Sequence, residues 1–599
     1  MNEIIDRRNV EFTLYELLEA EGLNRYQRYA EHGRETFDAA IETAHAIARD
    51  KFQPHNRKND LNEPELVDGK VQLIPEVKDA LDAFIEAGFL AATRDYDDGG
   101  MQLPAVVAQV CNSMFQGANI GTSAYTFLAA GVAHMLEAHA SEEQQRKYMD
   151  PIYEGRFFGT MALSEPHAGS SLADIKTRAE PTDEGHYLLS GAKMWISGGD
   201  QEISENIIHM VLAKIPGGPP GVKGISMFIV PKYLVNDDGS LGERNDWVCA
   251  GLNHKMGYRG TTNTFLKFGE KGQCVGYLVG EEHKGLSYMF HMMNGARIGV
   301  GMGAVMLGYG GYMASLDYAR ERPQGRHPDQ KDPASKPVPI IEHADVRRML
   351  LAQKAYVEGG YALGLYCSQL TDIQHQDPDP AERERAHLLL EMLTPVMKAW
   401  PSDYCLKAND MAIQVHGGYG YTREYPVEQF YRDNRLNPIH EGTNGIQGLD
   451  LLGRKMMMKG GEGLKLLGRE MQATIGEAAV VAELKEYAEA LGQSLHRIGK
   501  TVEVMGARMA GGDIRLGLAN ATLFLELTGH TIIAWIWLKQ ALTAHRGLTR
   551  AGEADQAFYQ GKLQACRYFF RYELPLVQPH AELLQAMDDT TLEMKNQWF

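Results

Sequence analysis

Three short segments of the sequence bring glycine and polar side chains close enough together to bind a ligand. The first, residues 161–171, reads MALSEPHAGSS, and the second, residues 193–199, reads KMWISGG. The third, residues 414–447, contains two glycine-rich stretches. Glycine lets backbone N–H groups approach an anionic group closely. A tryptophan beside a small hydroxyl residue, as in Trp195 and Ser197, offers a planar heteroaromatic ring a flat wall and a hydrogen-bond donor. Each segment alone could be an ordinary turn or helix cap, so only the combination indicates function.

Composition excludes several other kinds of site. The 599 residues include 60 Lys and Arg against 78 Asp and Glu, a net charge of −18. Proteins that bind nucleic acid normally concentrate positive charge, so we expect no nucleic-acid partner. The six cysteines form no CxxC pair, so we expect a reducing compartment. Because no HExxH motif occurs either, we expect no metal site. A Rossmann-type site is not supported either, because no GxGxxG follows a predicted strand.

The elements that must position these segments are mostly helical. Apolar spacing predicts helices over residues 34–52 and 73–91, and the sequence SEEQ at Ser141 predicts a capped helix start. Residues 157–280 differ, because short apolar runs alternate with Gly, Pro, Asp and Asn. This pattern predicts strands over 187–189, 207–214, 225–230 and 265–268 in an antiparallel sheet. Helical pattern returns over 285–319, 341–370 and 381–415, with a proline-rich loop over 323–339.

The most apolar stretch of the chain lies near its C-terminus. Residues 523–542 are interrupted by Glu526, His530 and Lys539, which predicts a buried helix rather than a membrane span. We therefore expect residues after about 456 to form a helical domain packed against the rest of the chain. The sequence begins with MNEIIDRR, which has charges where a signal peptide needs an apolar core, so we expect a cytoplasmic protein.

Taken together, the segments resemble the acyl-CoA dehydrogenase family of flavoproteins. Residues 161–171 resemble the family's first signature, residues 195–197 (WIS) its flavin-wall tripeptide, and residues 414–435 its second signature. Residues 441–443 (EGT) match the loop that carries the catalytic base in short- and medium-chain members. Residues 252–260 and 318–322 also fit. The resemblance runs from about residue 80 to residue 455, with the motifs in the family's order.

Three positions depart from the family's pattern. Residues 169–171 read Gly-Ser-Ser where the first signature usually reads Gly-Ser-Asp, Gln429 stands where a basic residue is usual, and His440 stands where tyrosine is common. The N- and C-terminal additions point to the larger branch of the family, which includes fatty acyl-CoA and 3-methylmercaptopropionyl-CoA dehydrogenases.

The resemblance implies a mixed α and β fold that is mostly helical. An N-terminal helical domain with an added N-terminal helix would span 1–156, and a middle β-barrel or sheet domain would span 157–280. A helical bundle that carries the base would span 281–455, followed by an additional helical domain over 456–599.

The resemblance also assigns roles to individual residues. Glu441 would be the base that removes the α-proton of an acyl-CoA while hydride passes from Cβ to flavin N5. Burial would raise the pKa of its carboxyl toward the working pH. The FAD-binding residues would be Leu163, Ser164, Gly169, Trp195, Ser197, Arg322, Gln414, Gly417, Gly418, Thr443, Asn444 and Gln447. Ser170, Arg297 and Gly442 would contact the substrate, although Arg297 could equally form an ordinary ion pair.

The expected function is FAD-dependent α,β-dehydrogenation of an acyl-CoA to a trans-2-enoyl-CoA, as in fatty acid β-oxidation. Electrons would pass to an electron-transferring flavoprotein. A homo-oligomer, at least a dimer, is expected, because Arg322 and residues 414–418 resemble a flavin site shared between subunits. The alternatives are a 3-methylmercaptopropionyl-CoA dehydrogenase, an acyl-CoA oxidase, and a catalytically silent acyl-CoA-binding scaffold. The sequence does not give the acyl chain length.

Overall fold

The computed structural model describes residues 3–550 and 552–599, which form two compact units. The first, here called the barrel unit, comprises Glu35–Leu103 and Cys111–Ala296. The second, here called the bundle unit, comprises the residues up to Arg34, Pro104–Val110 and Arg297–Phe599. The chain is mostly helical, as the sequence predicts, and its long strands all lie in the barrel unit.

The barrel unit combines a helical segment with all of the strands that the structure describes. Its helices are α2 (Arg34–Ile47), α3 (Asn56–Leu61), α4 (Pro75–Glu86), most of α5 (Ala105–Ala118), α6 (Ile120–His139), α7 (Glu142–Gln144) and α8 (Asp150–Tyr153). Its strands are β1 (Glu65–Val67), β2 (Lys70–Gln72), β3 (Phe157–Ala162), β4 (Arg178–Pro181), β5 (Tyr187–Ser197), β6 (Asn206–Lys214), β7 (Ile225–Pro231), β8 (Tyr233–Val235), β9 (Leu241–Arg244), β10 (Trp247–Leu252), β11 (Asn263–Phe268) and β12 (Val275–Leu278).

Five of these strands close into a ring. β5 pairs with β12, β12 with β7, β7 with β6, and β4 pairs with both β6 and β5. β3 extends the sheet beyond β6, and β11 and β10 extend it beyond β5. Apolar side chains such as Phe228, Leu266 and Trp247 fill its core. The expected β-barrel is therefore confirmed.

Two details differ from the sequence prediction. β3 pairs with β6 in parallel, and β4 and β6 also meet in parallel, so the sheet is not wholly antiparallel. The predicted helical N-terminal region also contains the small antiparallel hairpin of β1 and β2. Local patterns reveal strands but not their partners, because pairing joins residues far apart in sequence. The capping box at Ser141 is confirmed: its hydroxyl accepts from Gln144 N, and the Gln144 side chain accepts from Ser141 N.

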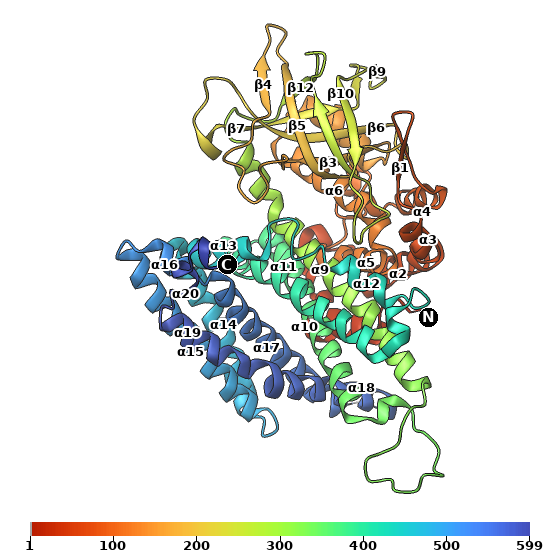
Figure 1. The fold of residues 1–599 in the computed structure, drawn as a ribbon, viewed down its shortest axis with the longest axis vertical. Helices are drawn as coiled ribbons and strands as arrows, with labels where there is room; N and C mark the ends of the chain where they lie inside the picture. Colours follow the sequence, from red (N-terminus) through yellow and green to blue (C-terminus); the bar gives the residue numbers. More distant parts are fainter. Residues whose placement is uncertain (1–2, 551) are drawn as a thin grey trace. The chain divides into compact units, whose positions relative to one another are not determined.

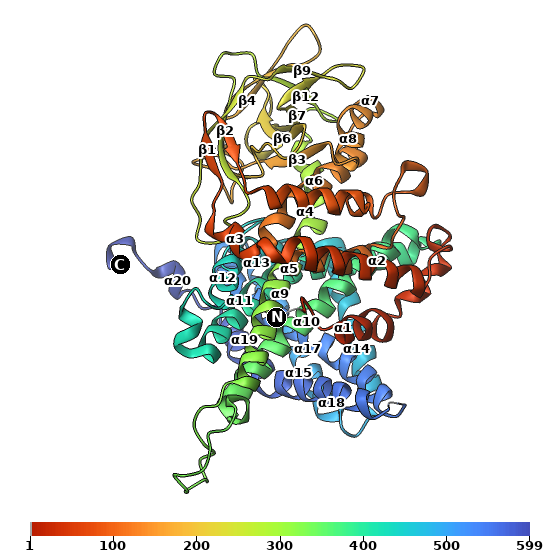
Figure 2. The same ribbon diagram turned by 90° about the vertical axis from the view of Figure 1, so that its right-hand side faces the viewer.

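The bundle unit is built of long helices. They are α1 (Arg7–Glu11), most of α9 (Gly285–Glu321), α10 (Ala344–Gln376), α11 (Pro380–His416), α12 (Val427–Asn434), α13 (Asn444–Gly453), α14 (Glu462–Ala479), α15 (Lys485–Ala510), α16 (Ile514–Leu518), α17 (Ala521–Leu548), α18 (Glu553–Tyr568), α19 (Val577–Gln585) and α20 (Thr590–Glu593). Between α9 and α10 the chain forms the expected loop over residues 323–339. Figures 1 and 2 show the C-terminal helices α14, α15, α17 and α19 lying side by side.

Helix α17 is the core of this C-terminal region, as the sequence predicts. It is long and apolar enough to cross a membrane by composition, but 83% of its most apolar window is buried within the protein. Trp535 and Trp537 are fully buried, and each indole N–H has an acceptor. Trp535 donates to Thr474 of α14 at 2.8 Å, and Trp537 donates to the Ala355 carbonyl of α10 at 2.9 Å. α17 is therefore a core helix with satisfied polar groups.

Helix α13 packs backbone to backbone against the start of α17. A Cβ atom at Gly448 would lie 2.7 Å from the Ala521 carbonyl oxygen, closer than any side chain can approach. Only glycine permits this contact. The C-terminal region thus supports the helix that follows the predicted base loop.

Candidate active site

In the barrel unit, a bulge in β5 turns Trp195 outward. Met194 and Trp195 together face the single residue Phe265 of β11, so the register shifts at this point. Trp195 has φ of 66° and its side chain is 61% exposed. Next along the strand, the Ser197 hydroxyl accepts a hydrogen bond from Asn263 Nδ2 at 3.2 Å. Bulges commonly re-aim side chains at binding sites, and this one presents an indole face with a hydroxyl beside it.

A buried ion pair holds the neighbouring segment against β5. Lys193 Nζ donates to the Leu163 carbonyl at 2.9 Å and to Glu165 Oε1 at 3.0 Å, and the next residue of β5 donates its N–H to the Ser164 carbonyl. Burial alone would raise the pKa of Glu165, but Lys193 and hydrogen bonds such as that from Thr177 hold it below its ordinary value. Burial lowers the pKa of Lys193 to about 8. The first motif is thereby fixed beside the second.

In the bundle unit, Glu441 stands immediately before α13 in a strained backbone conformation. Its φ is 51°, and Gly442 follows with φ of 83°. Thr443 caps α13 by accepting from Ile446 N, and Gln447 Nε2 donates to the carbonyl groups of Glu441 and Gly442 at 3.3 and 3.2 Å. A left-handed glutamate is costly unless the surroundings enforce it, and such strain concentrates at functional sites. Here the hydrogen bonds from Gln447 help to hold Glu441 in this conformation.

The electrostatic environment of Glu441 suits a general base. Desolvation by the surrounding protein raises the pKa of its carboxyl, and the positive charges of Lys398 and Arg297 oppose that rise. The residue nevertheless keeps exposed surface. Glu441 therefore combines an exposed residue position with a carboxyl pKa above that of an ordinary surface glutamate.

Two residues of α11 that belong to none of the sequence motifs, Lys398 and Asp403, also lie at this site. Lys398 is fully buried and its Nζ donates to Asn444 Oδ1 at 3.1 Å. Burial lowers the pKa of Lys398 to about 7, against the attraction of Asp403 and Glu441. Burial also raises the pKa of Asp403. The available sequence signal was a lysine within the apolar run of 392–400, a position where a charge needs a specific partner.

Arg297, predicted to contact the substrate, is 3% exposed and paired. Its Nη1 lies 2.8 Å from Asp450 Oδ2 of α13, and Asp450 also pairs with Arg454. Within the described part of the chain, Nε of Arg297 and Oε1 of Gln447 are buried without a hydrogen-bond partner. The ion pair that the sequence left open for Arg297 is therefore present, and it holds a positive charge near Glu441.

A third group of predicted residues lies at the end of α11. Gln414, Gly417 and Gly418 are exposed, and Gly417 has φ of 61°. The Arg322 guanidinium lies 5.8 Å from the ring centre of Tyr419 in the turn that follows. Arg322 is thus brought to the same turn as the glycine pair. His416, the neighbour of that pair, is structural: its Nδ1 is 2.8 Å from the Ala412 carbonyl and it stacks on a tyrosine.

The predicted site residues therefore fall into two sets. Leu163, Ser164, Gly169, Ser170, Trp195 and Ser197 belong to the barrel unit, where Gly169 and Ser170 lie in an exposed turn. Arg297, Arg322, Gln414, Gly417, Gly418, Glu441, Gly442, Thr443, Asn444 and Gln447 belong to the bundle unit. Hydrogen bonds join Leu163 and Ser164 to β5, and a ring contact brings Arg322 to the turn of Gly417 and Gly418.

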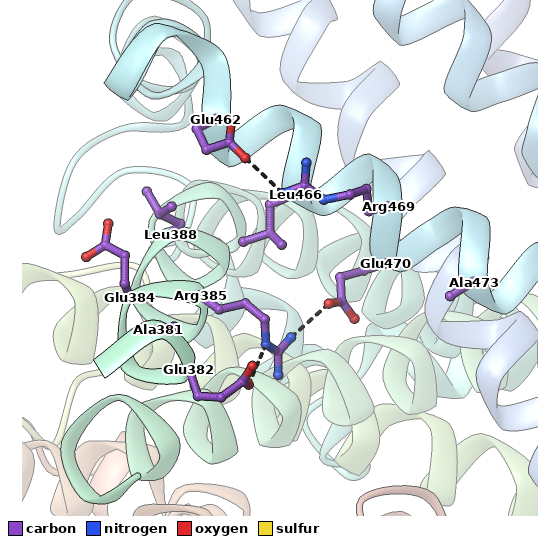
Figure 3. A pocket seen from close by; sticks show the side chains of 10 residues that line it. All are labelled: Ala381, Glu382, Glu384, Arg385, Leu388, Glu462, Leu466, Arg469, Glu470 and Ala473. Atoms are coloured by element: carbon purple, nitrogen blue, oxygen red, sulfur yellow. Dashed lines mark hydrogen bonds and ion pairs between the residues drawn. The ribbon is translucent and has the colours of Figure 1, made fainter. Parts of the chain in front are cut away.

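One surface pocket of the bundle unit lies away from the predicted site residues. It has a volume of about 530 Å³ and lies between the start of α11 and α14 (Figure 3). Its charged side chains are paired: Arg385 contacts Glu382 and Glu470, each at 2.8 Å, and Arg469 contacts Glu462 at 2.8 Å. None of the predicted site residues lines it. Among residues 3–550 and 552–599, no cluster of His, Cys, Asp and Glu could hold a metal ion either.

Comparison with known families accounts for nearly the whole chain. Residues 34–156, 160–269 and 283–457 match models of the N-terminal, middle and C-terminal domains of acyl-CoA dehydrogenases. Residues 467–595 match the model described as "acetyl-CoA dehydrogenase C-terminal like". The chain belongs to the acyl-CoA dehydrogenase family, and it is an oxidoreductase.

Individual relatives extend over the same length. The chain is 35% identical over 563 residues to 3-methylmercaptopropionyl-CoA dehydrogenase of Ruegeria pomeroyi, covering 94% of each chain. The solved structure of Caenorhabditis elegans ACDH-11 in complex with C11-CoA matches with a TM-score of 0.78 at 16% identity, covering 98% of this chain and 96% of that one. An acyl-CoA dehydrogenase from Bacillus anthracis, complexed with FAD, matches with a TM-score of 0.75 at 20% identity, covering 95% and 90%.

Proposed function

We propose that the chain oxidises an acyl-CoA thioester to its trans-2-enoyl-CoA, with FAD as cofactor and Glu441 as the base. The observation that carries the proposal is the state of Glu441. It is strained, accessible and desolvated, and it precedes α13 in the loop that resembles the base-bearing loop of the family. Family membership supports the reaction class.

Glu441 accepts the proton from Cα of the acyl group. Its raised pKa makes its carboxylate a stronger base than a surface glutamate, while Lys398 and Arg297 keep a fraction of it ionised. The Gln447 amide bonds to the carbonyl groups of Glu441 and Gly442, so the carboxylate starts from a fixed backbone. A fixed base avoids the entropy of orientation at the moment of transfer.

The negative charge that develops on the thioester oxygen needs hydrogen-bond donors. Among the residues that the structure describes, no acceptor takes the backbone N–H of Glu441. That N–H is therefore free to donate to a thioester oxygen. A preorganised donor at developing charge contributes about 3 kcal/mol or more to catalysis.

The residues of the barrel unit fit FAD. The exposed indole of Trp195 offers a stacking surface for the isoalloxazine ring, and the Ser197 hydroxyl beside it can donate a hydrogen bond. Leu163 and Ser164 are anchored on the same strand through their carbonyl groups. When bound, FAD supplies the acceptor for the hydride that leaves Cβ. In the bundle unit, Arg322 and the open Gly417–Gly418 turn suit its phosphates.

The substrate and the electron acceptor are tested together. Anaerobic addition of butyryl-, palmitoyl-, isobutyryl- and 3-methylmercaptopropionyl-CoA to the yellow protein should bleach the flavin absorbance with at least one of them. A catalytically silent scaffold would bind without bleaching. Reoxidation by an electron-transferring flavoprotein, without hydrogen peroxide, identifies a dehydrogenase. Stoichiometric peroxide in air would identify an oxidase and contradict the proposed acceptor.

We also propose a homo-oligomer, at least a dimer. Arg322, Gln414 and the glycine pair are exposed, Arg322 lies over Tyr419 of the turn that contains the glycine pair, and together they resemble a flavin site shared between subunits. Sedimentation of the flavin-loaded protein should give a mass at least twice that of the 66.6 kDa chain. A flavin-saturated monomer at working concentration would contradict this part of the proposal.

A further inference from the structure

The surroundings of Lys398 carry an inference that rests on the proposed role of Glu441. Lys398 lies on α11 and is fully buried. Its ammonium group reaches the first turn of α13, where it donates to Asn444 Oδ1 at 3.1 Å. Asn444 in turn donates to the Ala399 carbonyl at 3.4 Å, so α11 and the start of α13 are joined twice. Glu441 lies three residues before Asn444.

The placement is costly and therefore needs an explanation. Burying an ammonium group is unfavourable unless it is paired, and a helix N-terminus repels positive charge. Thr443 already caps α13, so the helix does not require a lysine there. The groups that act on Lys398 are Asp403 on its own helix, Glu441 before α13, and Arg297 on α9. His440, whose pKa burial lowers to about 3, also interacts with it.

We propose that Lys398 is a positioning residue for the base: through Asn444 it fixes the loop of Glu441, and its positive charge favours the ionised carboxylate. Arg297 supplies a second positive charge, but that guanidinium is already paired with Asp450. Lys398 donates to a neutral amide instead, and its charge attracts both Asp403 and Glu441. The proposal also accounts for a lysine in an otherwise apolar part of α11.

The pH profile of anaerobic flavin reduction tests the charge. Removing a positive charge raises the pKa of a neighbouring carboxyl, by about one unit or more for a close pair. The acid limb should therefore move to higher pH in Lys398→Met, by about one unit. In Lys398→Arg it should stay at or below the wild-type position, because the guanidinium is always charged. Lys398 and Glu441 titrate as a coupled pair. The decisive result is therefore the order of the acid limbs of wild type, Lys398→Met and Lys398→Arg along the pH axis.

Stability gives a readout that does not depend on activity. The pKa of Lys398 is about 7 in the folded protein against 10.5 ordinarily. Between these pH values the unfolded chain binds a proton that the folded chain does not, so this group makes stability rise with pH. Between about pH 7 and about pH 10, the denaturation midpoint of Lys398→Met should therefore rise less with pH than that of the wild type.

A matched control is Lys562→Met, which removes another fully buried lysine of the bundle unit. It should lose stability without moving the acid limb. The proposal is overturned if Lys398→Met leaves the limb at the wild-type pH, or if Lys562→Met moves it equally. If Lys398→Met does not fold, Lys398→Arg decides: a limb at higher pH than wild type would contradict the proposal. Glu441→Gln separates the two hypotheses, because full activity there would refute the proposed base itself.

Discussion

Lys398 and Lys562 are both fully buried lysines of the bundle unit, yet their surroundings differ. Lys562 on α18 donates to the carboxylate of Glu358 at 2.8 Å, to Gln540 at 3.0 Å and to Asn9. Lys398 donates to the neutral amide of Asn444. Burial lowers the pKa of Lys562 to about 8 and that of Lys398 to about 7.

Under our proposal, the difference separates a structural ion pair from a charge that acts on the base. Around Lys562 the partners come from α1, α10 and α17, so the network joins the N-terminal helix to the C-terminal region. A buried ion pair of this kind specifies an arrangement but adds little net stability, whereas breaking it is costly. Around Lys398 the charge is not neutralised by a direct partner. In the proposed reaction this charge acts on Glu441, the carboxylate that would accept the α-proton.

The most severe test of this contrast is to remove the C-terminal region. Deleting residues 457–599 takes away Lys562 and α17 but leaves Lys398 and Glu441 in place. We expect insoluble or flavin-poor protein, because the faces of α10, α11 and α13 that α17 covers would be exposed. Solubility, flavin content and turnover measure the outcome. A soluble, flavin-loaded truncation with normal turnover would show that the region does not support the site.

Next in size is Lys562→Met. It leaves Glu358 buried with fewer partners, since Lys354 still pairs with that carboxylate. We expect the free energy of unfolding to fall by about 3 kcal/mol, measured by chemical denaturation at neutral pH. A change below about 0.5 kcal/mol is what a substitution at an ordinary surface position gives. It would contradict the structural role of Lys562 and, with it, the contrast with Lys398.

A smaller effect is expected from Gly448→Ala. The added methyl group would meet the Ala521 carbonyl oxygen, so α13 and α17 must move apart. We expect a loss of about 1–3 kcal/mol in stability together with a lower kcat, since α13 follows the loop of Glu441, the proposed base. Gly468→Ala on α14 is the matched control, because a Cβ there meets open space. Equal behaviour of the two variants would refute the packing argument.

The sequence predicts features that are local in the chain. The loop of Glu441, the segment of Trp195 and Ser197, and the capping box at Ser141 each depend on residues only a few positions apart. The buried helix α17 is also recognisable in the sequence, because it is apolar on nearly all sides.

The remaining features depend on contacts between distant residues. The contact of Lys398 with Asn444 joins two helices, and the parallel pairing of β3 with β6 joins strands separated by two others. The bulge that exposes Trp195 depends on the register of β5 against β11. Periodicity reports which face of an element is buried, but not which element covers it.

The proposed reaction depends most directly on Glu441, and Glu441→Gln tests that role. The amide is nearly isosteric but cannot accept the α-proton. Anaerobic flavin reduction by the best acyl-CoA of the panel should slow by at least ~10²-fold, and exchange of the substrate's α-hydrogen with solvent deuterium should be lost with it. Flavin content and acyl-CoA binding should stay at wild-type levels. A reduction rate within a few-fold of wild type, with α-hydrogen exchange retained, would contradict the assignment of the base.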